Sequence, residues 1–179
     1  NALAAAAIAT ALNMPIDKIS AGLSTAESSS KWRMELHEIA GRLIINDSYN
    51  ANPESMFAAL DSLRLFAQER GGRAWAFLGK MHELGDYSLI GHREVARRAR
   101  DLEIDHLVAI GIKEYLIESE SGSTEIVFVE NIESAREIAT GSEAGDVILI
   151  KGSRAEGLEK LAELLIGDLN DLPMNESEG

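Results

Sequence analysis

The segment 47–53 (DSYNANP) combines residue types that can hold a ligand with hydroxyl or anionic groups. Asp47 directly follows an apolar run, and its carboxylate can accept hydrogen bonds from ribose hydroxyls. Asn52 and Pro53 are typical of a helix start, as the N-cap and the first helical residue. Such a helix end offers free N–H groups and a partial positive charge to a phosphate or carboxylate. A plain capped turn, in which backbone N–H groups satisfy Asp47, explains the residue types equally well.

The run 151–154 (KGSR) is the second chemically distinctive segment. It places two cations and a hydroxyl after an apolar run, in a chain whose formal net charge is -13. An arginine can hold a carboxylate through two parallel hydrogen bonds. The alternative is a helix start with solvated charges, and the contrast with the acidic chain favours an anion-binding role.

Two further segments carry weaker signals, namely 78–85 (LGKMHELG) and 111–113 (GIK). Glycine permits close approach of the backbone to a ligand. For both segments, however, an ordinary connection between a strand and a helix is the better explanation. His82 taken alone predicts a surface histidine rather than a base.

The elements that carry these segments alternate between strands and helices. Apolar or alternating runs predict strands at 33–39, 42–47, 73–78, 106–110, 126–129 and 147–150. Helices are expected at 53–69, 89–102, 113–118, 132–140 and 155–166. Continuous apolar strands between helices indicate an α/β fold whose mostly parallel sheet is covered by helices on both faces. The first two strands form an antiparallel hairpin, which we expect at one edge. Ligands of such sheets bind beyond the carboxyl ends of the strands, where all four polar segments lie.

The chain is expected to contain three parts. Residues 1–30 predict two helices, the first apolar nearly all round (NALAAAAIATAL), followed by a polar linker (TAESSS). A helix of this kind expects packing partners on most sides, so we interpret it as the end of an upstream domain. Residues 31–166 form the α/β domain, and 167–179 form an acidic tail that we expect to be frayed.

Composition excludes several functions. The acidic balance, with a pI near 4.7, argues against non-specific binding to nucleic acid and against docking on an anionic membrane. The absence of cysteine excludes disulfides and thiolate chemistry, and it is compatible with a cytoplasmic location. The sequence contains no P-loop and no G-x-G-x-x-G motif, and its four histidines are not spaced as a metal site. No membrane span is expected, since the N-terminal apolar run is too short.

Four segments together resemble the bacterial Mur ligases. They are NALAAAAIATAL, RLIINDSYNANPESM, LGKMHELG and VILIKGSR, in that order along the chain. The resemblance covers all but the acidic tail, and DSYNANP with KGSR is most similar to the D-alanyl-D-alanine-adding branch. It implies that residues 1–30 end a central ATPase domain and that a Rossmann-like C-terminal domain follows. It also implies ATP-dependent joining of D-Ala-D-Ala to UDP-N-acetylmuramoyl-tripeptide through an acyl phosphate, for peptidoglycan precursor synthesis. ATP and Mg²⁺ are the implied cofactors, with Mg²⁺ held mainly by the central domain.

The resemblance also implies roles for individual residues on the nucleotide side. Asn1 matches the asparagine that lies by the adenine. Arg33 matches the arginine that reaches the nucleotide phosphates when the domains close, and Asp47 matches the aspartate that holds the ribose. The chain departs from the family at Lys80, where this branch usually has Asp, so Lys80 is left out of the expected site.

The remaining implied residues lie on the substrate side. The resemblance implies catalytic roles for Arg33, Asn50 and Asn52, and substrate binding by Tyr49, Asn52, Lys151, Ser153 and Arg154. Two alternatives remain open. One is a related ligase with another amine substrate, such as a diaminopimelate- or lysine-adding enzyme or a folylpolyglutamate synthetase. The other is a non-catalytic Rossmann-like module that only binds a partner.

Overall fold

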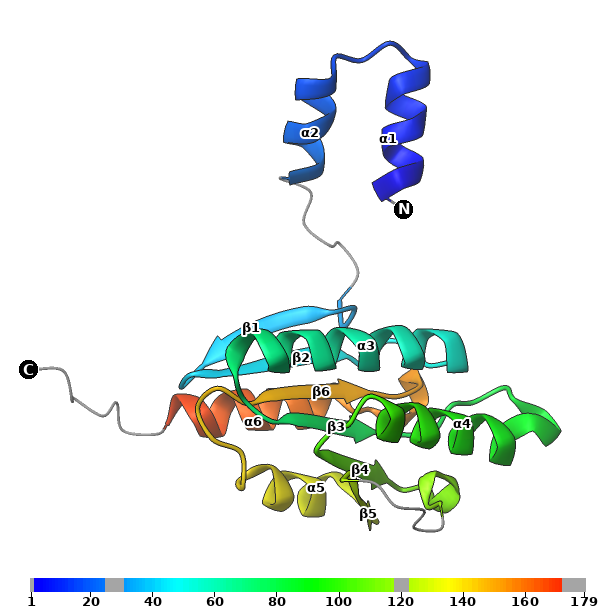
Figure 1. Cartoon of the computed structure of the whole chain (residues 1–179), viewed down its shortest axis with the longest axis vertical. Helices are drawn as coiled ribbons and strands as arrows, with labels where there is room; N and C mark the ends of the chain where they lie inside the picture. The colour runs from blue at the N-terminus through cyan, green and yellow to red at the C-terminus, as the bar shows by residue number, and fades with distance from the viewer. Residues whose placement is uncertain (1, 25–30, 118–122, 172–179) are drawn as a thin grey trace, which may run out of the picture. The chain divides into compact units, whose positions relative to one another are not determined.

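The computed structural model describes residues 2–24, 31–117 and 123–171 of the 179-residue chain. The chain divides into two compact units, Asn1–Lys31 and Trp32–Gly179. Figure 1 shows both units.

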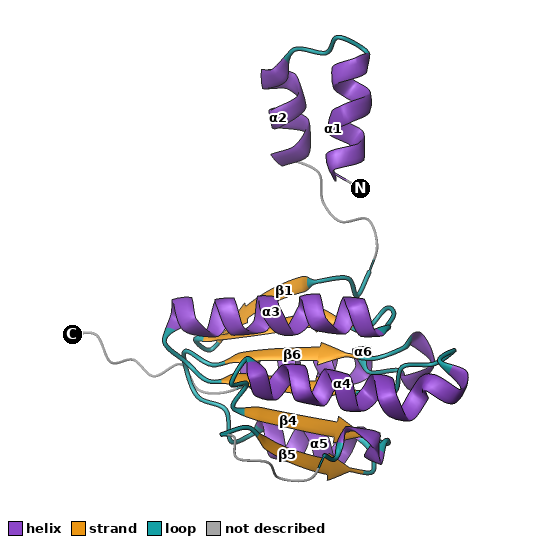
Figure 2. Cartoon of the chain, turned by 45° about the vertical axis from the view of Figure 1, so that its right-hand side comes forward, coloured by secondary structure: helices purple, strands orange, loops and turns teal. Residues whose placement is uncertain are grey.

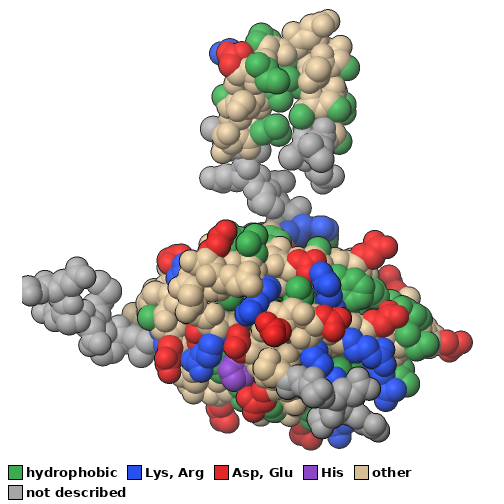
Figure 3. Space-filling view, viewed as in Figure 1, with side chains coloured by type: hydrophobic (Ala, Val, Ile, Leu, Met, Phe, Trp, Pro, Cys, Tyr) green, Lys and Arg blue, Asp and Glu red, His purple; other side chains and the backbone are tan. Residues whose placement is uncertain are grey.

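The smaller unit is a pair of helices, α1 (Ala2–Ala11) and α2 (Ile16–Ser24). Among its described residues only Ile19 is buried. Five large apolar side chains are exposed, namely Ile8, Leu12, Met14, Ile16 and Leu23. The space-filling view in Figure 3 shows hydrophobic side chains along both helices. The described residues of this unit therefore do not form an apolar core of their own.

The larger unit is a six-stranded sheet in the order β1-β2-β6-β3-β4-β5. The strands are β1 (Glu35–Ile39), β2 (Arg42–Asp47), β3 (Ala74–Leu78), β4 (His106–Ile110), β5 (Glu125–Val129) and β6 (Val147–Lys151). Only β1 is antiparallel to its neighbour, and it lies at one edge. Its turn into β2 has positive φ at Ala40 and Gly41, as a tight two-residue hairpin requires. The expected mostly parallel sheet with an antiparallel edge is confirmed.

Helices cover both faces of this sheet (Figures 1 and 2). They are α3 (Pro53–Arg70), α4 (Ser88–Asp101), α5 (Ile132–Ala139) and α6 (Glu159–Asn170), with single 3-10 turns η1 (Gly85–Tyr87), η2 (Lys113–Tyr115) and η3 (Arg154–Glu156). Alternate residues of a strand point to opposite faces. Leu43 and Ile45 accordingly pack into the core under α3 and α4, whereas Ile44 packs into the core under α5 and α6.

Four of the expected boundaries were wrong. The helix predicted at 155–166 is a 3-10 turn followed by α6, because Gly157 adopts a left-handed conformation (φ 65°). The strand predicted from 33 begins at Glu35, because Trp32 and Met34 also have positive φ. The tail expected from 167 is helical up to Asn170, and residues 172–179 lie outside the described part. The short helix predicted at 113–118 is a single turn, and residue 118 also lies outside the described part.

The amino ends of β3 and β6 are joined by the buried carboxylate of Asp146. It accepts hydrogen bonds from the backbone N–H groups of Arg73 (2.8 Å) and Glu143 (2.9 Å), from the indole N–H of Trp75 (2.9 Å) and from the Arg73 guanidinium. Burial alone would raise the pKa of Asp146, but these donors outweigh it and lower the pKa. Asp146 thus holds the end of the sheet opposite the polar segments.

We expect Asp146→Ala to lower the free energy of unfolding by about 3 kcal/mol, because it leaves the Trp75 and Arg73 donors without their acceptor. Urea unfolding of the chain measures this. Glu143→Gln is the matched control, since its carboxylate is 81% exposed and lies 3.8 Å from Arg73, and it should change the same quantity by less than about 0.5 kcal/mol. Equal losses in the two variants would contradict the anchoring role.

Candidate functional site

Three of the four polar segments meet at one cavity of about 470 Å³. Its lining residues come from the start of α3, from the loop after β3 and from the loop after β6: Asn50, Ala51, Asn52, His82, Glu83, Leu84, Ser153, Arg154 and Ala155. The fourth segment, 111–113, contributes no residue to this lining. The cavity lies beyond the carboxyl ends of β2, β6 and β3, because its lining residues follow these three strands in the chain.

Strand register explains why these segments meet. β6 lies between β2 and β3 and is parallel to both. Asp47 at the end of β2 is level with Lys151 at the end of β6, which is level with Leu78 at the end of β3. The expectation that the 47 and 151 regions share one edge of the sheet is confirmed.

Lys151 is a buried partner of Asp47. Its ammonium donates to the Asp47 carboxylate at 2.6 Å and to the backbone oxygen of Asn50 at 2.9 Å. The two side chains are 3% and 13% exposed, respectively. A buried charge of this kind requires a partner, and each side chain supplies the other's. Lys151 is therefore not a solvated cation, and its observed contacts hold the loop that leads from β2 into α3.

The start of α3 has the expected cap. The Asn52 side chain accepts from the Ser55 N–H at 2.8 Å, and the Ser55 hydroxyl accepts from the Asn52 N–H at 3.1 Å. Pro53 is the first helical residue. This reciprocal cap fixes the direction of an 18-residue helix whose N-terminus lies at the cavity.

The loops after β3 and β6 are in close contact. The Gly79 N–H donates to the Lys151 oxygen at 2.9 Å, and the Ser153 N–H donates to the Lys80 oxygen at 3.0 Å. A Cβ atom at Gly152 would lie 2.9 Å from a methyl group of Leu158 and 3.3 Å from the Cα of Gly79. A side chain at position 152 would force Leu158 and the loop at Gly79 to shift, so glycine here allows the two loops to approach closely.

His92, a buried residue of α4, holds the loop after β3 in place through its two ring nitrogens. Its Nε2 accepts from the Met81 N–H at 2.9 Å, and its Nδ1–H donates to the Ser88 oxygen at 2.7 Å. This pattern requires a neutral imidazole, and burial lowers the pKa of His92 accordingly. The Tyr115 hydroxyl adds a bond to the Gly79 oxygen at 2.9 Å.

An arginine–aromatic cluster lies beside Asp47. The guanidinium of Arg33 lies 4.2 Å from the ring centre of Tyr49, and that of Arg154 lies 3.9 Å from the ring of Trp32. The Tyr49 N–H donates to the Trp32 oxygen at 3.0 Å. The Met34 N–H donates to Asp47 at 3.2 Å. Residues 32–34 are thus attached to the loop after β2, which brings Arg33 to the same edge of the sheet.

The structure assembles most of the residues singled out from the sequence. Asn50, Asn52, Ser153 and Arg154 line the cavity, while Asp47, Tyr49, Lys151 and Arg33 surround its β2 side through the contacts given above. Asn1 lies outside the described residues.

Sequence reasoning missed the lining residues His82, Glu83 and Leu84. Gly79 and Gly85, which flank this loop, were the sequence feature that could have indicated a functional loop. Glu83 has φ 64°, an uncommon conformation for a residue with a side chain and one often found at functional sites.

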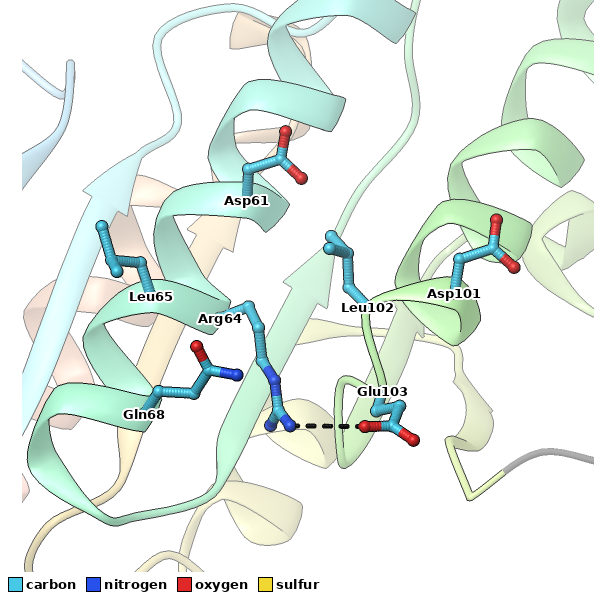
Figure 4. A pocket seen from close by; sticks show the side chains of 7 residues that line it. All are labelled: Asp61, Arg64, Leu65, Gln68, Asp101, Leu102 and Glu103. Carbon is cyan, nitrogen blue, oxygen red and sulfur yellow. Dashed lines mark ion pairs between the residues drawn. The ribbon is translucent and has the colours of Figure 1, made fainter.

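A second hollow lies away from the strand ends. It is lined by α3 from Asp61 to Gln68 and by the end of α4, with Arg64 lying 3.6 Å from Glu103 (Figure 4). Its arginine is already partnered, and we assign it no function. Among the residues that the structure describes, no three acidic or histidine side chains are grouped to hold a metal ion. No described helix is long and apolar enough to cross a membrane.

Comparison with known proteins adds three findings. A family model described as Mur ligase, glutamate ligase domain matches residues 32–154. The UDP-N-acetylmuramoyl-tripeptide–D-alanyl-D-alanine ligase of Mycobacterium tuberculosis is 34% identical over 94% of this chain, which spans 37% of that relative. Solved structures of MurF from Acinetobacter baumannii (30% identity) and of MurF ligase from Thermotoga maritima in complex with ADP (26% identity) superpose with a TM-score of 0.75. They cover 93% and 92% of this chain, which spans 36% of each.

Replacing Lys151 by methionine should lower the free energy of unfolding by about 3 kcal/mol, because Asp47 is left as a buried charge without its partner. Urea unfolding measures the change. Lys80→Met is the matched control, since Lys80 is an exposed lysine on the neighbouring loop, and it should shift stability by less than about 0.5 kcal/mol. A Lys151→Met variant as stable as the control would show that the pair contributes nothing.

The stability of the chain should fall as the pH drops below about 6.5, the ordinary pKa of histidine in the unfolded chain. In that range the unfolded chain binds a proton at His92, while the folded chain resists it because its pKa is lowered. The slope contributed by this group is at most about 1.4 kcal/mol per pH unit, and it ends below the folded pKa. Unfolding at a series of pH values should show a shallower slope for His92→Gln than for the unaltered chain. An unchanged slope in His92→Gln would contradict the neutral buried imidazole.

Proposed function

This chain belongs to the Mur ligase family, through the glutamate ligase domain that residues 32–154 match, and on that premise we propose that it is the C-terminal part of a ligase that adds D-alanyl-D-alanine to UDP-N-acetylmuramoyl-tripeptide. The relatives that it matches over most of its length carry that name. The chain spans a little over a third of their length. The observation that carries the proposal is the meeting of the β2, β3 and β6 ends around one cavity, beside an aspartate and an arginine suited to a nucleotide.

The reaction joins a carboxylate of the tripeptide to the amine of the dipeptide. ATP, when bound, supplies the phosphoryl group that converts this carboxylate into an acyl phosphate. The protein's contribution to such a transfer is chiefly positioning and stabilisation of negative charge. The amine then attacks the acyl phosphate, and phosphate leaves through a tetrahedral intermediate. In this proposal the extended UDP-N-acetylmuramoyl peptide is a precursor of peptidoglycan, made in the cytoplasm.

On the nucleotide side, Asp47 and Arg33 have the chemistry that the proposal requires. Among the described residues, each oxygen of the Asp47 carboxylate has one donor, Lys151 or Met34. A carboxylate oxygen has two lone pairs, so each retains one for a ribose hydroxyl. Arg33 is exposed and stacks on Tyr49, which leaves the edge of its guanidinium free for phosphate oxygens.

On the substrate side, the cavity presents positive and hydrogen-bonding groups. Arg154 and the N-terminus of α3 suit the carboxylate of the dipeptide. Ser153, Asn52 and Asn50 would supply polar groups near the reacting carbonyl, and Tyr49 lies next to Arg154 of the same site. Lys151 takes part by holding Asp47 and the loop to α3 in place.

The remaining machinery belongs to upstream domains in this proposal. The sequence contains no P-loop, and the described residues offer no metal cluster, so Mg²⁺ would be held mainly by a central ATPase domain. The exposed apolar side chains of α1 and α2 suit packing against that domain. The chain alone should therefore be catalytically inactive.

Arg33→Ala in a full-length ligase that carries these residues should lower turnover about 100-fold or more, because one cation facing the transferring phosphoryl group is lost. The measurement is release of ADP that depends on both UDP-N-acetylmuramoyl-tripeptide and D-Ala-D-Ala. Arg93→Ala is the control, since this arginine is exposed on α4, and it should keep the original rate.

Wild-type turnover in Arg33→Ala would count against the proposed nucleotide contact. A product that carries glutamate, lysine or diaminopimelate in place of D-Ala-D-Ala would identify a related ligase. A partner affinity that survives Asp47→Ala and Lys151→Ala together, in a protein that hydrolyses no ATP, would identify a binding module.

A further inference from the structure

His82 and Glu156 form a hydrogen-bonded pair at the cavity that the proposed function does not use. The imidazole Nε2 lies 2.5 Å from Glu156 Oε1, and the two side chains are 40% and 23% exposed. The backbone N–H of His82 donates to the Ser153 hydroxyl at 2.9 Å. His82 is therefore fixed at both its backbone and its side chain, although it is half exposed.

This pairing determines which ring nitrogen is free. The Glu156 carboxylate accepts the hydrogen bond, so Nε2 carries the proton and the lone pair resides on Nδ1. Among the described residues, the structure records no hydrogen-bond partner for Nδ1. His82 lines the cavity, a carboxylate orients it through one ring nitrogen, and the other nitrogen makes no hydrogen bond to a described residue, which is the arrangement of a general base.

The surrounding charges suit an amine substrate that also carries a carboxylate. On the loop of His82 itself lie Lys80, which is exposed, and Glu83, which lines the cavity. On η3 lie Glu156 and Arg154, and the loop that leads into α3 also lines the cavity. A ligand carboxylate directed to Arg154 and α3 leaves its ammonium group for the His82 and Glu83 side of the cavity.

We propose that His82 is a further catalytic residue, which accepts a proton from the ammonium group of the incoming amine substrate. This proposal rests on the proposed function, in which an amine attacks an acyl phosphate. An ammonium group has no lone pair and cannot attack. Transfer of one proton to His82 Nδ1 gives a neutral amine and an imidazolium, whose charge Glu156 balances.

The rest of the step then balances. The amine lone pair forms the C–N bond at the acyl carbon, and the C–O bond to phosphate breaks with its electron pair leaving on phosphate. The second proton of the amine nitrogen passes to the departing phosphate or to water. The imidazolium returns its proton to water before the next turnover. Glu156 is a positioning residue in this scheme, since it acts on the substrate only through His82.

His82→Gln in the full-length ligase is the decisive variant. A glutamine side chain can still donate a hydrogen bond to Glu156, but it cannot hold a proton. Two nucleophiles are compared at the same pH: the dipeptide, which enters as an ammonium ion, and hydroxylamine, which reaches the acyl phosphate already neutral. We expect kcat with D-Ala-D-Ala to fall about 100-fold, while hydroxamate formation stays within about twofold of wild type. Glu156→Gln should lower the dipeptide reaction by a smaller factor and should also spare hydroxamate formation.

Other results would overturn the assignment. A parallel loss with both nucleophiles would show that His82 only holds the two loops together, and urea unfolding of the variant would report that loss of structure. Unchanged dipeptide turnover in His82→Gln would also reject the base. If the wild-type ligase uses a different amine, the proposed substrate is wrong, and the same comparison with that amine tests His82. If it uses no amine at all, both proposals fail.

Discussion

The candidate site depends on one buried ion pair between neighbouring parallel strands. Lys151 ends β6 and Asp47 ends β2 in the same register, and their charged groups are in direct contact with little water access. The second bond of the ammonium, to the Asn50 oxygen, extends the constraint into the loop before α3. Because a buried charge is costly without its partner, the loop has little freedom to leave this position. This ion pair therefore positions the start of α3, including Asn52, and the β2 side of the cavity.

Contacts between the other two loops complete the site. The loops after β3 and β6 share backbone hydrogen bonds, and Gly152 allows them to approach closely. His92 supports the first of them from the core, and the His82–Glu156 pair joins them at the cavity. Loops held this way can present polar side chains with the precision of regular elements. The parallel sheet supplies the common edge, and these few polar contacts determine what is displayed there.

The sequence predicted the architecture because its signals were local. Apolar runs between helices indicate a parallel sheet, and the Asn52–Pro53 pair marks the start of α3 without any tertiary information. That the 47 and 151 segments share an edge also followed, since parallel strands all end on the same side. The burial of Lys151 could not be predicted, because it depends on β6 lying next to β2, and strand order is set by long-range packing. His82 was underrated for the same reason: its partner, Glu156, is 74 residues away along the chain. The helix expected from 155 failed because Gly157 interrupts a pattern that is otherwise helical.

The antiparallel edge strand has a consequence for how copies of this domain behave at high concentration. β1 has a neighbour on one side only, so its outward N–H and C=O groups are a template on which a strand of another molecule can align. Its sequence is ELHEI, with Glu35 and Glu38 separated by two residues. Two such strands brought together edge to edge would place like charges close to one another. This repulsion opposes self-association of the domain into extended sheets.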